Sequence, residues 1–407
     1  MCLGVILHKI LKTILGPPLV QIAKIYRKYL RKTTFIGITG SCGKTTTKDL
    51  IAAILSEKNK GVKNKESLNA LYSIIKTIFK VRPWHRFCVH EIGISNSGPG
   101  ILNDSLAVFM PDIGIVINIG LDHYKAFRSL KAIAAEKSKL IEALPKNGTA
   151  ILNTDDTNVL DMKDRTAANV ITYGLSKEAM IRAENISCVW PARLSFNIVY
   201  NGESLPVKTN LCGTHWVYSV LAALAVGLVI GIPLEESIKV IQTVKPTPGR
   251  MSPVYVEDGV VFIHDDWKAP LWSLKYSLEF MKNAKAKRKV IVIGTISDYP
   301  GDSAGKYVSV AKQSLSIANK VIFVGHFAHC SLKAKRNPKD DNIMAFDTVK
   351  ETSMYLKRFL IKGDLVLIKG SLRADHLQRI ILARTSQVKC WKPKCGKTLF
   401  CSDCQLL

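Results

Sequence analysis

The sequence predicts an α/β protein with two domains: a central one with a mostly parallel sheet and a phosphate-binding loop, and a Rossmann-like one after it. Short apolar runs alternate with helix-like stretches along most of the 407 residues, as βαβ units require. One run, FIGITG (35–40), leads into a glycine-bounded turn and then a helix-like stretch. We expect four parts: a basic amphipathic segment (1–33), the central domain (34–247), the Rossmann-like domain (248–386) and a four-cysteine tail (387–407).

Composition limits the classes of function. Lys and Arg number 58 against 32 Asp and Glu, and the resulting net charge of +26 attracts polyanions such as nucleic acid or anionic lipid. The basic residues are spread along the chain without a nucleic-acid-binding motif, so we interpret them as general basicity and do not expect nucleic acid as a partner. Ten cysteines without a recognisable export signal indicate a reducing compartment, the cytoplasm.

The amino-terminal segment, residues 1–33, carries apolar residues at helical spacing interleaved with Lys and Arg. Neither of its two apolar runs is long enough to span a bilayer. A basic amphipathic hairpin could lie peripherally on the inner surface of an anionic membrane, and it could equally pack against the body of the protein. The pattern leaves both interpretations open.

The turn after the first apolar run reads GSCGKTT. Its glycines allow the backbone N–H groups to point inward at the start of a helix, where a nucleotide phosphate fits. Lys44 can then reach the outer phosphates, and Thr45 offers a hydroxyl to Mg²⁺. The general pattern has one more glycine, at the position of Ile38. The residues predicted to bind the nucleotide are Gly40, Ser41, Cys42, Gly43, Lys44, Thr45 and Thr46.

Two further apolar runs, FCVHEIG (87–93) and DIGIVINIG (112–120), end near groups that can bind a metal. Ligands gather at the carboxyl ends of strands in open α/β sheets, so Glu91 and His123 can share an edge with the phosphate turn. Glu91 suits Mg²⁺, which prefers oxygen and takes one or two carboxylates besides phosphates. Histidine is a less usual Mg²⁺ ligand, and a plain surface residue is the alternative for His123.

Lys137 falls inside the apolar helical stripe of RSLKAIAAEKSKLIEALPKNG. Burial of an ammonium is unfavourable, so this side chain must reach solvent, pair with an acid or lose its charge. Reaching solvent is the simplest interpretation. The sharper hypothesis is that CO₂ carbamylates Lys137, which converts a buried amine into a carboxylate able to hold a metal.

The second half of the chain begins with an uncharged apolar run in GTHWVYSVLAALAVGLVIGIP (213–233), which we interpret as a buried core helix. Prolines and a glycine at 245–249 predict a domain boundary. Beyond it, the runs VVFIHDD, KVIVIG, KVIFVG and DLVLIKG predict the Rossmann-like domain. Its most reactive-looking groups are Arg250, Asp265 and Asp266, and structural ion pairs are the alternative for them.

The tail carries cysteines at 390, 395, 401 and 404. Cys390, Cys395, Cys401 and Cys404 suit tetrahedral Zn²⁺, and the last two form the CxxC pair typical of such sites. The first spacing is longer than usual and the intervening loop is short. Free thiols or redox chemistry are the alternatives to structural zinc.

Taken together, these stretches resemble the Mur ligases, the ATP-dependent amide-forming enzymes of peptidoglycan synthesis, and most closely the branch that adds D-alanyl-D-alanine. The resemblance runs from about Phe35 to Ile381. It rests on ITGSCGKTTTKDLI, HEIGISNSGPG, PDIGIVINIGLDHYKAFRSLKAIAAEKSKL, GTH, GRM, DDWKAP and GDLVLIKGS, in this order. It implies a P-loop ATPase domain, ATP and Mg²⁺ as cofactors, and small-molecule or peptide substrates: a carboxylate that becomes an acyl phosphate and an amine that displaces the phosphate.

The same resemblance implies roles for single residues. Lys44 and Thr45 match the residues that hold the phosphates and a first Mg²⁺. Glu91 and His123 match metal ligands, and Lys137 matches the lysine that is carbamylated to support a second metal. The resemblance therefore implies Lys44, His123 and Lys137 as the catalytic set.

The second domain both extends the resemblance and departs from it. Arg250 matches an arginine that reaches ATP from the linker, and Asp265 or Asp266 matches the acid that contacts the ribose. The family's asparagines after the GxH motif are Trp216 and Ser219 here, and its aspartate-tyrosine-asparagine-alanine-asparagine run reads DWKAP. The family's N-terminal UDP-sugar domain has no counterpart before the phosphate turn, so a UDP-MurNAc-peptide is not the expected substrate. A non-catalytic nucleotide-binding partner protein is the rival hypothesis.

Overall fold

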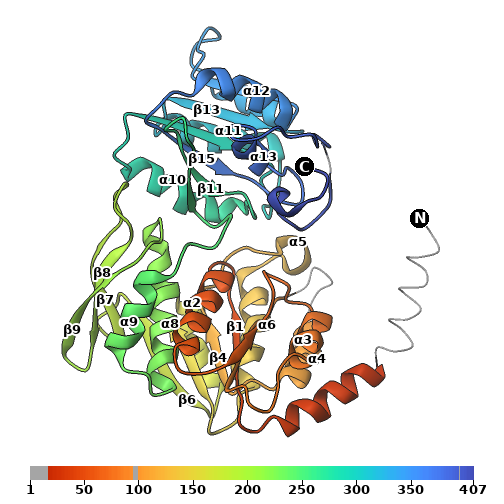
Figure 1. Ribbon diagram of the computed structural model, residues 1–407, viewed down its shortest axis with the longest axis vertical. Coiled ribbons are helices and arrows are strands. Elements are labelled where there is room, and N and C mark those ends of the chain that lie inside the picture. The colour runs from red at the N-terminus through yellow and green to blue at the C-terminus, as the bar shows by residue number, and fades with distance from the viewer. Residues whose placement is uncertain (1–16, 95–99, 394) are drawn as a thin grey trace. The chain divides into compact units, whose positions relative to one another are not determined.

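The computed structural model describes residues 17–94, 100–393 and 395–407. Residues 1–16 of the predicted amphipathic segment and residues 95–99 of the HEIGISNSGPG stretch lie outside the described residues. The chain forms two compact units (Figure 1). Unit 1 contains the chain up to Asn185, Phe196–Lys208 and Val217–Val244, whereas unit 2 contains Ile186–Ser195, Thr209–Trp216 and Lys245–Leu407.

The described part of unit 1 is built on a nine-stranded sheet with the strand order β2-β3-β1-β4-β5-β6-β7-β8-β9. The neighbours from β2 through β7 pair in parallel. Parallel neighbours end at the same edge, so the carboxyl ends of β1, β3 and β4 meet. The strands are β1 (Thr34–Thr39), β2 (Gly61–Lys63), β3 (Phe87–Glu91), β4 (Ile113–Val116), β5 (Thr149–Asn153), β6 (Asn169–Gly174), β7 (Ile181–Ser187), β8 (Ser195–Tyr200) and β9 (Glu203–Lys208).

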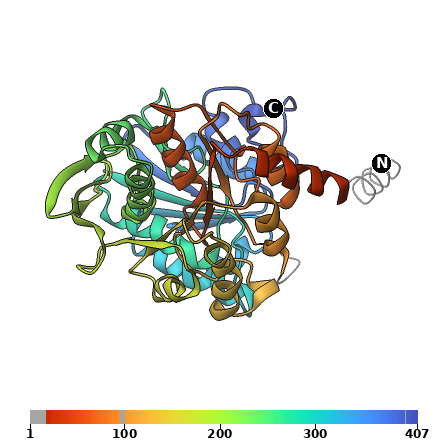
Figure 2. The same ribbon diagram turned by 90° about the horizontal axis from the view of Figure 1, so that it is seen from below.

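Helices cover both faces of this sheet. Helices α2, α8 and α9 pack together, and helices α3, α4 and α6 form a second group (Figures 1 and 2). Helix α8 is buried along most of its length, as predicted for a core helix, and no helix among the described residues is long and apolar enough to cross a membrane. The helices are α2 (Lys44–Ser56), α3 (Leu71–Ile78), α4 (Ile101–Phe109), α5 (Tyr124–Phe127), α6 (Leu130–Glu142), α7 (Thr157–Leu160), α8 (Val217–Val229) and α9 (Leu234–Thr243).

A helix over residues 17–29 precedes β1. Ala23 joins the hydrophobic core of unit 1. The buried Arg27 guanidinium donates hydrogen bonds to the Phe109 carbonyl at 2.9 Å and to Asp112 at 3.1 Å. One face of the helix therefore packs against the body of the protein, and the opposite face exposes Ile22, Ile25 and Tyr29.

The described part of unit 2 is built on a six-stranded sheet with the strand order β10-β11-β15-β12-β13-β14, parallel except for the pair β10–β11. The predicted α/β class with mostly parallel sheets is therefore confirmed. The strands are β10 (Ser252–Tyr255), β11 (Val261–Asp265), β12 (Arg288–Ile293), β13 (Lys320–Val324), β14 (Ile343–Phe346) and β15 (Asp364–Lys369). The helices are α10 (Leu274–Asn283), α11 (Ser303–Leu315), α12 (Val349–Phe359) and α13 (Gln378–Leu382).

Two segments inside the range expected for the central domain belong to unit 2, namely residues 186–195 and 209–216. The Trp190 ring lies 6.3 Å from the Tyr255 ring and 6.4 Å from the Phe280 ring, measured between centroids. These aromatic contacts join the first segment to elements that follow it by more than 60 residues. Unit 2 therefore contains two segments that precede the predicted domain boundary, and one boundary along the sequence cannot separate the two units.

Candidate phosphate and metal site

The glycine turn follows β1, whose neighbours in the sheet are β3 and β4. Gly40 and Gly43 have φ angles of 150° and 89°, which L side chains rarely adopt. A Cβ on Gly40 would lie 3.1 Å from the Cβ of Ile117, and a Cβ on Gly43 would lie 3.0 Å from the Oγ of Ser219. Backbone conformation and close packing therefore both favour glycine at these two positions.

Helix α2 begins directly after Gly43, which provides no side-chain cap within the described structure. The first N–H groups of a helix have no partner inside the helix, and the helix dipole favours an anion beside them. The Lys44 ammonium donates a hydrogen bond to the Gly40 carbonyl, and Thr45 and Thr46 are buried in the first turn. This end of α2 can therefore receive phosphate oxygens.

Asn118, just past the end of β4, holds the turn in shape. Its side-chain oxygen accepts hydrogen bonds from the backbone N–H groups of Ser41 at 3.0 Å and Cys42 at 2.9 Å. Its side-chain nitrogen donates to the Cys42 carbonyl at 3.3 Å. Asn118 was not predicted from the sequence, although a polar residue just past a neighbouring apolar run was an available signal.

Asp122 connects the turn to Lys137. One carboxylate oxygen accepts a hydrogen bond from the Ser41 hydroxyl at 2.6 Å, and the other lies 3.1 Å from the Lys137 ammonium. The same ammonium donates to the Gly40 carbonyl at 3.3 Å. Lys137 is fully buried, so it does not reach solvent: in this structure it is paired with an acid, the second of the three predicted possibilities.

The electrostatics of Asp122 reflect this arrangement. Burial by itself raises the pKa of its carboxyl group, but the charges of Lys137 and Lys44 and the hydrogen bond from Ser41 outweigh burial and hold the pKa below its usual range. His123 contributes in the same direction. Asp122 is therefore a carboxylate at neutral pH, and it was not among the predicted site residues.

Glu91 ends β3 beside the turn, because it pairs in register with Ile38 of β1. Its carboxylate lies 3.0 Å from the ammonium of Lys48, and each of the two side chains is 1% exposed. The backbone N–H of Glu91 donates to the Asn64 side chain at 3.0 Å. Lys48, which lies one turn after Lys44 on α2, is a second charged residue that was not predicted from the sequence.

His123 follows Asp122 directly and adopts a left-handed conformation with φ of 55° where helix α5 begins. The structure thus brings Glu91, Asp122, His123 and Lys137 to the sheet edge that carries the glycine turn. Among the described residues, no three His, Cys, Asp or Glu side chains are grouped as a ready metal site. The donors still fit Mg²⁺, which prefers oxygen and binds through one or two carboxylates together with substrate phosphates.

The acidic pair of unit 2 is engaged within that unit. The Asp265 carboxylate lies 2.8 Å from the Lys369 ammonium, and the Asp266 carboxylate lies 2.6 Å from His264 Nε2. Burial alone would lower the pKa of His264, but Asp266 outweighs it and raises that pKa. Both acids are therefore engaged in ion pairs within unit 2, and their predicted contact with a ribose stays a prediction.

Three other predicted positions have defined surroundings. The Arg250 guanidinium lies over the Trp267 ring, 5.5 Å from its centroid. Trp216 is buried, and its indole N–H donates to the Cys212 carbonyl at 3.0 Å. Ser219 is buried on α8, where it limits the space at Gly43. The two residues found in place of the family's asparagines therefore have packing roles in their own units.

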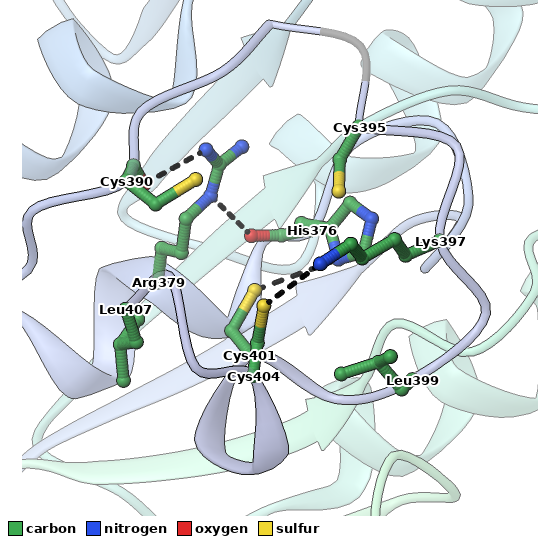
Figure 3. Close-up of a pocket in the computed structure, with 9 residues that line it drawn as sticks. All are labelled: His376, Arg379, Cys390, Cys395, Lys397, Leu399, Cys401, Cys404 and Leu407. Carbon is green, nitrogen blue, oxygen red and sulfur yellow. Dashed lines mark hydrogen bonds between the residues drawn. The ribbon is translucent and has the colours of Figure 1, made fainter. Parts of the chain in front are cut away.

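The four tail cysteines lie together. They line one small cavity of about 10 Å³ in unit 2, and all four are thiols and not disulfides (Figure 3). The Cys401 sulfur lies 3.5 Å from His376 Nδ1, and the Lys397 ammonium lies 3.5 Å from the Cys404 sulfur. The sequence placed the cysteines near one another, but it could not identify the residues around them.

Comparison with known proteins identifies similar chains. Residues 38–227 match the Mur ligase middle domain family. The chain is 29% identical over 350 residues to a UDP-N-acetylmuramoyl-tripeptide--D-alanyl-D-alanine ligase of Synechocystis, which covers 83% of this chain and 71% of the relative. A protein of the same name from Mycobacterium tuberculosis is 28% identical over 299 residues, which covers 72% of this chain but only 58% of the relative. The resemblance to the D-alanyl-D-alanine-adding Mur ligases is therefore confirmed.

Solved structures with the same fold include MurF from Acinetobacter baumannii, with a TM-score of 0.82, 22% identity and coverage of 91% of this chain and 80% of that chain. A second is the MurF ligase from Thermotoga maritima in complex with ADP, with a TM-score of 0.78, 21% identity and coverage of 90% and 82%. At this identity the likeness shows the fold alone.

We expect Asp122→Asn to destabilise unit 1 by about 3 kcal/mol near neutral pH, because it leaves the buried Lys137 ammonium without its counter-charge. A carboxyl group whose pKa is lowered by folding stabilises the folded state above its unfolded pKa, and this contribution is lost as pH falls through the folded pKa. The difference in unfolding free energy between wild type and variant should therefore shrink below the ordinary carboxyl pKa of 3.8. Urea unfolding across this pH range measures the difference.

The matched control for this prediction is Glu236→Gln, which removes a pair with Lys58 in which both side chains are about half exposed. Its effect should stay below about 1 kcal/mol. A difference in unfolding free energy between wild type and the Asp122→Asn variant that is independent of pH would contradict the assigned ion pair.

Proposed function

We propose that this chain, which has a Mur ligase middle domain and resembles the D-alanyl-D-alanine-adding Mur ligases, is an ATP-dependent carboxylate–amine ligase. The proposed substrates are a cell-wall or related peptide carboxylate and a small amine such as an amino acid or dipeptide. One observation carries the proposal: the glycine turn at the start of α2 is joined through Asp122 to a fully buried lysine. Such a cluster, at the carboxyl edge of a parallel sheet, suits phosphoryl transfer.

In the proposed first step, the substrate carboxylate attacks the γ-phosphate of ATP, and the bond to the leaving ADP breaks to give an acyl phosphate. The backbone N–H groups at the start of α2 orient the phosphates, and Lys44 moves from the Gly40 carbonyl to neutralise their charge. Mg²⁺, held by Thr45, Glu91 and His123, would offset further charge on the transferring group. In the second step an amine displaces phosphate and forms the amide.

Lys137 is proposed to act as a carbamate. Its neutral amine would attack CO₂, form an N–C bond and release one proton, which leaves a carboxylate in place of the ammonium. This carboxylate would face the Asp122 carboxylate, now 3.1 Å from the lysine nitrogen. Two buried carboxylates close to each other repel unless a cation lies between them. The proposed carbamate therefore requires the second metal ion.

The substrate is proposed only as a class. The relatives are named for a UDP-N-acetylmuramoyl-tripeptide and D-alanyl-D-alanine, but the chain matches 58% of the length of the mycobacterial protein and 71% of the Synechocystis protein. The altered DWKAP run and the buried Trp216 change the positions at which the family contacts nucleotide and acceptor. The altered run and the buried tryptophan support a Mur-type reaction on a related peptide.

The rival proposal is a nucleotide-binding Mur-like partner protein without turnover. It is favoured by Asp265 and Asp266, because their carboxylates are occupied by Lys369 and His264 and are not held open for a ribose. The two proposals agree on nucleotide binding and differ on the release of phosphate.

We also propose that the helix over residues 17–29 contacts an anionic membrane surface. This contact would bring the protein to a lipid-linked substrate. Ile25 and Tyr29 are 69% and 71% exposed, and Ile22 lies one turn before Ile25. The half-buried Lys24 and the exposed Lys28 alternate with these apolar residues, and the exposed Arg31 and Lys32 follow them. Apolar side chains among basic ones are typical of helices that lie in a membrane interface.

We expect Lys44→Ala to lower kcat/KM for ATP-dependent ligation by about 10²-fold or more, because a preorganised charge on the transferring phosphoryl group is lost. The measurement is the release of ADP and phosphate with pools of candidate acids and amines. Lys58→Ala, which removes a half-exposed lysine in the same unit, should leave the rate unchanged. Activity that survives Lys44→Ala counts against the ligase, whereas nucleotide binding without phosphate release favours the rival.

A second prediction concerns Lys137. The variants Lys137→Ala and Lys137→Arg should both lose turnover, because neither can form a carbamate, and short carboxylic acids should partly restore activity to the alanine variant alone. An arginine would retain the positive charge beside Asp122, so an active Lys137→Arg enzyme would contradict the carbamate. A carbamate resonance from wild type in ¹³C-bicarbonate provides a readout that does not depend on activity.

For the membrane, we expect Ile25→Glu to weaken binding to phosphatidylglycerol-containing vesicles roughly tenfold, because burying an isoleucine side chain contributes about 1.5 kcal/mol or more. Co-sedimentation of the full chain measures this. Met354→Glu, at a residue that is 55% exposed on α12, is the control and should bind as wild type does. Equal binding of wild type and Ile25→Glu would exclude this helix as the contact.

A further inference from the structure

The four tail cysteines lie around one small cavity. Their side chains line the same small cavity, although they are distributed over 15 residues of chain (Figure 3). The cavity volume of about 10 Å³ is enough for one water-sized atom or ion. Leu399 and Leu407 provide apolar lining. Four thiols around a space of atomic size, without disulfides, suit one tetrahedral soft-metal ion.

The surroundings of this cavity are positively charged. Arg379 is 2% exposed, and its guanidinium donates to the carbonyls of Cys390 at 3.2 Å and Lys392 at 3.1 Å, which attaches the beginning of the tail to α13. The Lys397 ammonium lies beside the Cys404 sulfur. A metal ion with four thiolates carries a net charge of −2, and a buried cation stabilises such a group.

The tail also contacts neighbours of the unit 2 residues for which a nucleotide role was predicted. The Phe400 ring lies 5.1 Å from the Trp267 ring, and a Cβ on Gly249 would lie 3.0 Å from it. Gln378 joins the two regions, because its backbone N–H donates to Asp266 at 2.9 Å and its side chain donates to the Ser402 hydroxyl at 3.2 Å. Phe400 directly precedes Cys401, so the tail that carries the cysteines also carries the ring packed at Gly249.

We propose that Cys390, Cys395, Cys401 and Cys404 bind one Zn²⁺ ion, and that this ion holds Phe400 against Trp267 and Gly249. Binding releases four protons, one from each thiol, as four Zn–S bonds form. In the described structure no three ligand side chains are yet grouped closely enough for a metal, so the sulfurs must move inward and the Lys397 ammonium outward. This site serves the structure of unit 2 and does not depend on the proposed ligase activity.

The test is the metal content of the full chain, expressed with added Zn²⁺ and purified without a metal-affinity column. We expect about one zinc per chain by mass spectrometry of the elements. Cys395→Ser and Cys404→Ser should each lose most of it. Cys330→Ser is the matched control, because Cys330 is a partly buried thiol of unit 2 outside the tail. Wild type without zinc, or a double variant carrying Cys395→Ser and Cys404→Ser that retains it, overturns the proposal.

A spectroscopic measurement avoids dependence on the folding of the variants. Co²⁺ exchanged into the wild-type chain should give thiolate-to-metal charge-transfer absorption and the intense d–d bands of a tetrahedral ion. Weak octahedral bands without charge transfer would exclude the four-thiolate site.

The proposed role of the ion has its own readout. Chelation of zinc, or Phe400→Ala with zinc retained, should remove hydrogen-exchange protection from the backbone amides of 249–250 and 264–267. Unchanged protection in these segments after chelation would show that the ion does not hold Phe400 in place.

Discussion

The structure of the candidate site depends on the register of β1 between β3 and β4. Ile38 of β1 lies opposite Glu91, and Thr39 lies opposite Val116, so three strands end at one level. A glycine turn on the middle strand then meets polar residues from both neighbours. A shift of this register by one residue would turn Glu91 to the opposite face of the sheet and separate it from Lys48.

The sequence was sufficient for those parts of the site that local chemistry dictates. The apolar run at 35–40, the two glycines and the start of α2 all follow from residues adjacent in the chain. Asn118 and Asp122 were not predicted, because their roles come from contacts with Ser41, which precedes them by 77 and 81 residues. A polar side chain after a strand cannot be distinguished from an ordinary loop residue until its contact partner in the fold is known.

The partners of the buried lysines also could not be predicted, because they are distant in the sequence. The apolar stripe around Lys137 predicted that its charge needed an explanation, and reaching solvent was the simplest one. The structure instead pairs it with Asp122, an acid 15 residues earlier that no helical period connects to it. The burial of Lys48 could not be predicted from the sequence, because α2 is rich in polar residues at its beginning. In unit 2, the partners of Asp265 and Asp266 come from β15 and β11, and spacing alone could not decide between ion pairs and a ligand contact.

The charged side chains of the site are already paired, and this pairing limits which ligands can bind there. Glu91 and Asp122 each have a buried lysine as a partner, Lys48 and Lys137, and the Lys44 ammonium is bound to the Gly40 carbonyl. A metal ion that took a carboxylate would leave a buried ammonium unpaired, and a phosphate that took an ammonium would leave a buried carboxylate unpaired. Either change alone is unfavourable, because an isolated buried charge is strongly destabilising. A metal ion and a polyphosphate that arrive together carry both signs of charge and can replace both partners at once. The proposed binding of a metal–nucleotide complex is therefore more favourable at this site than the binding of either component by itself.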